Sequence, residues 1–105
     1  MTKAVFFHNG VLIRGFEISG HSSQSSDDEN GRLICAAVSS AAYMAANTLI
    51  EILKLDVVSE VSEEYMSIKL LNAESEACQC VLRGFELHLK SLAGQYPKKL
   101  AVSSQ

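Results

Sequence analysis

The stretch of sequence that decides the fold is residues 32–54, which read RLICAAVSSAAYMAANTLIEILK. Small and apolar side chains fill nearly all of it, and Arg32 and Glu51 are the only charged residues before Lys54. This composition is typical of a helix, because alanine and leucine favour helical backbone. The near absence of charge predicts that the helix is buried on most of its sides.

The sequence before this helix predicts a β-hairpin and a loop. Residues 3–7 and 11–18 are rich in β-branched and aromatic side chains, and His8-Asn9-Gly10 separates them. Asn-Gly between two such runs is a strong signal for a hairpin turn. Residues 20–31 contain no apolar side chain, which predicts a solvated loop between the hairpin and the helix.

The sequence after the helix predicts a second hairpin and a second helix. Residues 57–61 and 65–71 have the pattern of strands and flank a polar turn at 62–64. From residue 74 to about residue 96, apolar side chains recur at three- and four-residue spacing with charged residues between them, as in an amphipathic helix. Residues 100–102 are expected to form a closing strand.

The expected order is therefore ββαββαβ, an α+β fold with a mainly antiparallel sheet and two long helices. The helices can both cover one face of the sheet, or they can sandwich the sheet between them. A chain of 105 residues has the length of one domain, and no repeat or linker divides it. We therefore treat residues 1–105 as a single domain, which can bury a core without disulfides or a metal ion.

Charge and cysteine content exclude several classes of function. The chain has 9 Lys and Arg residues against 12 Asp and Glu residues, so it lacks the basic face that binds nucleic acid. The sequence shows no signal peptide, and no uninterrupted apolar stretch reaches about 18 residues. We expect a cytoplasmic protein that contacts neither nucleic acid nor a membrane. Three cysteines, an odd number, argue against a disulfide framework.

The pair Cys78 and Cys80 suggests a metal site at first sight. Residues two apart on a helix, however, point about 200° away from each other, so their two thiols cannot share one ion. We therefore expect Cys78 to pack in the core. We expect the protein to use no metal ion and no other cofactor.

Cys35 and His21 are the candidates for chemistry. We expect Cys35 within the first turn or so of its helix, where unbonded backbone N–H groups and the helix dipole stabilise a thiolate. An imidazole within reach, such as His21, would form the thiolate–imidazolium pair of cysteine nucleophiles. The same N–H groups could receive the oxyanion of a tetrahedral intermediate. The alternative is that Cys35 is one more small residue in an alanine-rich helix and His21 an ordinary loop histidine.

The residues around this pair resemble the signature of a known family. Gly20-His21, the polar loop and residues 33–39, which read LICAAVS, are similar to the motif of the ribosomal-processing cysteine protease family, Prp. The resemblance covers nearly all 105 residues. It implies a homodimeric cysteine endopeptidase that removes an N-terminal extension from the precursor of a bacterial large-subunit ribosomal protein. The catalytic pair would be His21 and Cys35, with Gly20 and Ser39 as further site residues.

The resemblance also implies a mechanism of acyl transfer. His21 would accept the Cys35 proton, the thiolate would attack the scissile carbonyl, and water would then hydrolyse the thioester. The loop of residues 20–31 would close over an extended peptide. Its acidic residues would attract the basic N-terminal region of a ribosomal protein. These acids are Asp27, Asp28 and Glu29.

One position departs from the family pattern, because Arg32 stands where an aspartate is usual, three residues before the cysteine. A neighbouring acid in the loop, Asp27, Asp28 or Glu29, would have to take over that carboxylate's role. The departure keeps two other functions open, namely a non-catalytic peptide-binding dimer of the same fold and a structural dimer with an incidental cysteine. Dimerisation is expected because the small side chains of the first helix allow another backbone to approach closely; the alternative is that this helix is sandwiched within one chain.

Overall fold

The structure, a computed structural model, describes residues 1–20 and 28–105. Its elements are, in chain order, β1 (Thr2–Asn9), β2 (Leu12–Ser19), α1 (Glu29–Asn47), the π-helical turn η1 (Thr48–Ile52), β3 (Val57–Ser62), β4 (Tyr65–Leu70), α2 (Glu76–Gln95) and β5 (Leu100–Ser104). The order ββαββαβ is confirmed, and so is the α+β fold.

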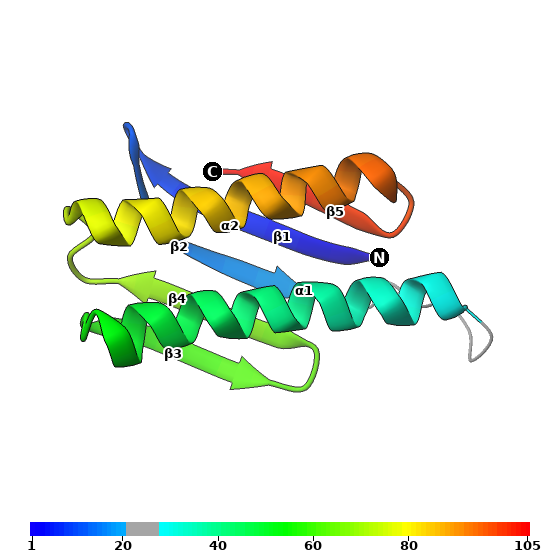
Figure 1. Cartoon of the computed structure of the whole chain (residues 1–105), viewed down its shortest axis with the longest axis horizontal. Helices are drawn as coiled ribbons and strands as arrows, with labels where there is room; N and C mark the ends of the chain where they lie inside the picture. The colour runs from blue at the N-terminus through cyan, green and yellow to red at the C-terminus, as the bar shows by residue number, and fades with distance from the viewer. Residues whose placement is uncertain (21–27) are drawn as a thin grey trace.

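The five strands form one sheet in the order β3-β4-β2-β1-β5. The pairs β1–β2, β2–β4 and β3–β4 are antiparallel, whereas β5 runs parallel to β1. Both helices lie on the same face of this sheet (Figure 1). The first of the two expected arrangements is therefore the observed one.

The turn of the first hairpin lies one residue later than the Asn-Gly signal suggests. Asn9 still pairs with Leu12, so Gly10 and Val11 are the two central residues of the turn. Gly10 has a φ of 62°. Glycine adopts this left-handed conformation without the steric cost of a Cβ atom, which explains why the turn centres on Gly10 while Asn9 stays in the strand.

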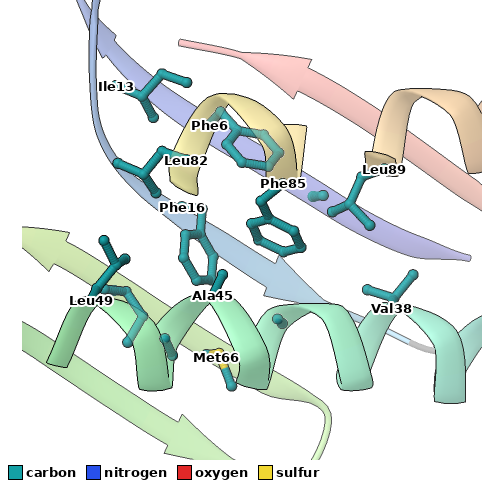
Figure 2. Packing of buried hydrophobic residues seen from close by; sticks show 14 of the residues in the cluster. Phe6, Ile13, Phe16, Val38, Ala45, Leu49, Met66, Leu82, Phe85 and Leu89 are labelled. Carbon is teal, nitrogen blue, oxygen red and sulfur yellow. The ribbon is translucent and has the colours of Figure 1, made fainter. Parts of the chain in front are cut away.

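The core lies between the sheet and the two helices, and aromatic rings form its centre (Figure 2). The ring of Phe85 on α2 meets Phe6 of β1 at a centroid distance of 5.4 Å and Phe16 of β2 at 4.9 Å, both edge to face. Such edge-to-face pairs are favoured over flat stacking by the ring quadrupole. Leu82 and Leu89, also on α2, are fully buried beside them. This cluster fixes α2 over β1 and β2.

The first helix is buried along one face only, which corrects the expectation of a helix buried on most sides. Its buried residues are Gly31, Ile34, Val38, Ala42, Ala45 and Ala46. Its exposed large apolar side chains are Leu33, Tyr43 and Met44. The physical reason is that α1 packs on the sheet and against α2, and no segment within residues 1–20 and 28–105 covers its outer side (Figure 1).

By length and hydropathy alone, residues 29–52 could also cross a bilayer, and they are the one such helix among the described residues. Core helices of folded domains meet the same two criteria, so this property assigns no membrane location. In the fold described here, the helix instead contributes Val38, Ala45 and Leu49 to the core (Figure 2).

Candidate active site

A cavity of about 300 Å³ lies at one end of the sheet, beside the N-terminal half of α1. Cys35 and Ser39 on α1 form part of one wall. The lining also includes Thr2 at the start of β1, Gly20 after β2, and residues 62–65 of the β3–β4 turn and the start of β4. These segments meet because β1 begins, β2 ends and the β3–β4 turn lies at the same end of the sheet, as the pairs Lys3–Ser19 and Ser19–Tyr65 show.

Cys35 lies in the second turn of α1, at the far limit of the expectation that it falls within the first turn or so. The helix begins at Glu29, earlier than expected, because Asp28 caps it. The N–H of Arg32 already donates to the carbonyl oxygen of Asp28 at 3.1 Å. The dipole effect of a helix falls off within its first turn, so the groups that stabilise a thiolate at Cys35 must be sought among the side chains around the cavity.

Asp28 starts α1 and ties it to the C-terminal part of the chain. One carboxylate oxygen, Oδ1, accepts the N–H of Gly31 at 2.9 Å. The other, Oδ2, forms an ion pair with Nζ of Lys99 at 2.5 Å. Asp28 thus caps the start of α1, so it is the acid among residues 27–29 that the structure shows in a helix-starting role. Its carboxylate is engaged within the fold, while Glu29 beside it is exposed.

The glycine that precedes the predicted catalytic histidine is held against two other segments. Gly20 has a φ of 85°, and a Cβ atom at this position would lie 2.5 Å from the carbonyl oxygen of Met1, so only glycine fits. Its N–H donates to the carbonyl oxygen of Glu64 in the β3–β4 turn at 3.2 Å. The predicted site residues His21 and Asp27 lie outside the described residues.

A polar side chain that contacts the cysteine comes from a residue that sequence reasoning missed. The hydroxyl oxygen Oγ1 of Thr2 lies 3.8 Å from Sγ of Cys35. Thr2 is buried, with 2% of its surface exposed, and Cys35 is reduced and half-buried. The two residues are 33 positions apart, and no sequence motif links them. The predicted residue Ser39 lines the same cavity one helical turn after Cys35.

The β3–β4 turn contributes the acidic side of the cavity, which sequence reasoning also missed. Glu63 and Glu64 line the cavity together with Tyr65, and Tyr43 of α1 faces it from the other wall. In the sequence, residues 62–64 show only the pattern of a polar turn. Their role in the cavity follows from the sheet order, which brings β4 beside β2.

The other two cysteines lie on α2, away from this cavity. Cys78 is fully buried, which confirms the prediction that it packs in the core. Burial raises the pKa of its thiol, because the thiolate would lose its hydration. Cys80 is exposed. Among residues 1–20 and 28–105, no three His, Cys, Asp or Glu side chains gather in a way that would hold a metal ion.

Comparison with known proteins identifies the class of this protein as the cysteine proteases. The family model described as cysteine protease Prp matches residues 1–101, nearly the whole chain. The chain belongs to the Prp family of cysteine proteases, as the sequence motif around Gly20 and Cys35 predicts. No curated protein matches the sequence.

Solved structures show the same fold. A protein from Streptococcus mutans, SMU.848, superposes with a TM-score of 0.89 at 25% identity, over 100% of this chain and 94% of that chain. The ribosomal processing protease Prp from S. aureus, in complex with a covalently linked product peptide, superposes with a TM-score of 0.88 at 13% identity over the full length of both chains. The same protease with a substrate peptide gives 0.88 at 11% identity.

Proposed function

We propose that the protein is a cysteine endopeptidase whose catalytic pair is His21 and Cys35. The observation that carries the proposal is the reduced, half-buried thiol of Cys35 on the wall of a cavity, in a chain of the Prp family. Gly20 immediately precedes His21 and borders the same cavity as Cys35.

The proposed reaction passes through a thioester. His21 accepts the proton of the Cys35 thiol, and the thiolate attacks the carbonyl carbon of the scissile peptide bond. The carbon–nitrogen bond then breaks, and His21 returns the proton to the leaving amine. Water attacks the thioester and releases the acid product, which restores the thiol.

We further propose that the substrate is the N-terminal extension of a bacterial large-subunit ribosomal protein precursor. S. aureus Prp, which has the same fold, is described as a ribosomal processing protease bound to peptides. The exposed acidic side chains Glu63 and Glu64 at the cavity, with Glu29 at the start of α1, suit the basic N-terminal region of a ribosomal protein. Asp28 contributes less to this attraction because its carboxylate is paired with Lys99.

We propose that the enzyme works as a homodimer in the cytoplasm. The exposed side of α1 offers a surface for the second copy, because Leu33 and Met44 are 59% and 70% exposed there. Large apolar side chains gathered on one face of a helix are common at subunit interfaces. A dimer mass by light scattering at micromolar concentration supports this assembly, and a monomer mass contradicts it.

The test of the proposed function is intact-mass spectrometry of an extended ribosomal-protein precursor after incubation with the enzyme. The wild-type chain is expected to produce one new N-terminus, whereas Cys35→Ala and His21→Ala leave the precursor whole. Cys80→Ala serves as the matched control, because Cys80 is exposed on α2 and its loss should leave the cleavage unchanged.

A binding protein of the same fold predicts a different result. The exposed Arg32, in place of the usual acid, is the feature that favours this second function. If the wild-type chain binds the precursor and leaves it whole, the fold serves recognition and the proposed catalysis is wrong. Cleavage that persists in Cys35→Ala would equally contradict the assignment of the nucleophile.

A further inference from the structure

We infer that the hydroxyl group of Thr2 positions the sulfur of Cys35 and stabilises its thiolate, an inference that rests on the proposed role of Cys35 as nucleophile. Thr2 lies at the start of β1, with its Oγ1 atom 3.8 Å from Sγ of Cys35. Only 2% of Thr2 is exposed, although its side chain carries a polar group. A buried hydroxyl beside a half-buried thiol fits a role toward that thiol.

The backbone around Thr2 holds this hydroxyl in a fixed place. The N–H of Thr2 donates to the carbonyl oxygen of Lys99 at 3.0 Å, and Thr2 pairs with Leu100 in the parallel ladder of β1 and β5. Threonine is also branched at Cβ, which restricts its first side-chain torsion. The hydroxyl is therefore set before the thiol ionises, and little reorganisation is needed when charge appears on Sγ.

The contact favours the charged form of the cysteine over the neutral form. A neutral thiol is a weak donor and a weak acceptor. A thiolate accepts the Thr2 O–H in a charge-assisted hydrogen bond, which is roughly twice as strong as a neutral one. A hydrogen bond that is stronger to the charged form lowers the pKa of the group. The Thr2 hydroxyl thus lowers the pKa of the Cys35 thiol.

The surroundings of the cavity explain why such a donor is needed. Within the described part of the chain, the other ionisable side chains on its walls are Tyr43 of α1, Glu63 and Glu64 of the β3–β4 turn, and Tyr65 at the start of β4. The two carboxylates disfavour a further negative charge nearby, such as a thiolate at Cys35. The start of α1 is capped by Asp28 and lies nearly two helical turns before Cys35. A neutral donor in the wall supports the thiolate without repelling a basic peptide.

The test is the pH profile of Cys35 alkylation by iodoacetamide, between about pH 5 and pH 9, where thiolates form. Trypsin cuts after Arg32 and Lys54, so Cys35 is read alone in peptide 33–54, while Cys78 and Cys80 fall together in peptide 70–83. Thr2→Val removes the hydroxyl and keeps the shape. We expect it to raise the midpoint of the Cys35 profile by about one pH unit, a roughly tenfold loss of thiolate below the midpoint.

Two further variants distinguish the loss of the Thr2 hydroxyl from a change in packing and from the effect of removing any threonine hydroxyl. Thr2→Ser retains the hydroxyl and should keep the midpoint within about 0.3 pH units of wild type. Thr48→Val removes the other threonine hydroxyl of the chain, which donates to the carbonyl oxygen of Met44, and should leave the profile unchanged. If Thr2→Val does not fold, Thr2→Ala against Thr2→Ser makes the same comparison.

An unchanged midpoint in Thr2→Val would overturn the inference, and so would a shift in Thr2→Ser as large as that in Thr2→Val. The alkylation profile does not depend on cleavage of any precursor. A shifted midpoint in a chain that cleaves nothing therefore keeps the role of Thr2 and rejects the proposed protease. Cleavage with unshifted midpoints rejects the role of Thr2 and keeps the protease.

Discussion

The two long helices each carry a cysteine toward the same face of the sheet, yet the two thiols have opposite surroundings. Cys78 on α2 is fully buried between the helix and the sheet, and burial raises its pKa. Cys35 on α1 borders a cavity and lies next to a hydroxyl group. In Figure 1 the two helices lie side by side on the sheet, and the N-terminal ends of α1 and α2 lie at opposite ends of it. The packing around each thiol, rather than its closeness to a helix start, thus decides whether the cysteine is buried or accessible.

The largest effect that would sharpen this comparison is the rate of alkylation of the two thiols near neutral pH. We expect iodoacetamide to modify Cys35 about a thousandfold faster than Cys78, because Cys78 becomes accessible only when α2 separates from the sheet. Site-resolved mass spectrometry of the tryptic peptides measures both rates. In denaturant the rates should converge. Comparable rates in the folded chain would show that α2 does not protect its cysteine.

The next effect concerns the side chain that anchors α2. Gln79 accepts the N–H of Ile13 at 2.8 Å through Oε1, and its Nε2 donates to the carbonyl oxygens of Ile13 at 2.9 Å and Ala73 at 2.7 Å. Gln79→Ala leaves these part-buried backbone groups without a protein partner, so we expect the free energy of unfolding to fall by about 2 kcal/mol.

Urea titration measures that loss, and Gln95→Ala is the matched control at the exposed end of the same helix. The control should change the free energy of unfolding by less than about 0.5 kcal/mol. If Gln79→Ala behaves like the control, the hydrogen bonds of Gln79 do not hold α2 in place, and the contrast between the helices rests on apolar packing alone.

The smallest of the three effects concerns the start of α1. Asp28→Ala removes both the helix cap and the ion pair with Lys99, and we expect a loss of about 1 to 2 kcal/mol in unfolding free energy. Asp28→Asn keeps a capping oxygen and loses only the charge, so its loss should be less than half as large. Thermal or urea unfolding measures both. Equal losses would show that the ion pair, rather than the cap, fixes the start of α1.

The strands and helices were predictable because their signals are local. Alternation of apolar side chains along β4 and their helical spacing along α2 each span a few residues, and both elements formed where expected. The start of α1 was not predictable, since three adjacent acids, residues 27–29, can each serve as a cap in the sequence. The structure selects Asp28, whose second oxygen pairs with Lys99 across the fold.

Only those residues of the candidate site that belong to the sequence motif were predictable. The motif places Gly20, Cys35 and Ser39, and the structure puts these three around one cavity. Thr2 and the β3–β4 turn reach the cavity through strand pairing between distant segments. Nothing in the local sequence of Thr2 distinguishes it from a threonine at the beginning of any strand, so its contact with Cys35 required the structure.

The parallel pairing of β5 with β1 has a consequence for the order in which parts of the chain fold. Thr2 is held by the carbonyl oxygen of Lys99, and the start of α1 is held by the side chain of the same lysine. The segments on both sides of Cys35 therefore depend on contacts between the two ends of the chain. Contacts between residues this far apart in sequence cost the most loop-closure entropy and form late in folding. A partly folded chain therefore has Cys35 without the neighbours that surround it in the folded chain, so under the proposed function the cysteine is expected to become reactive only late in folding.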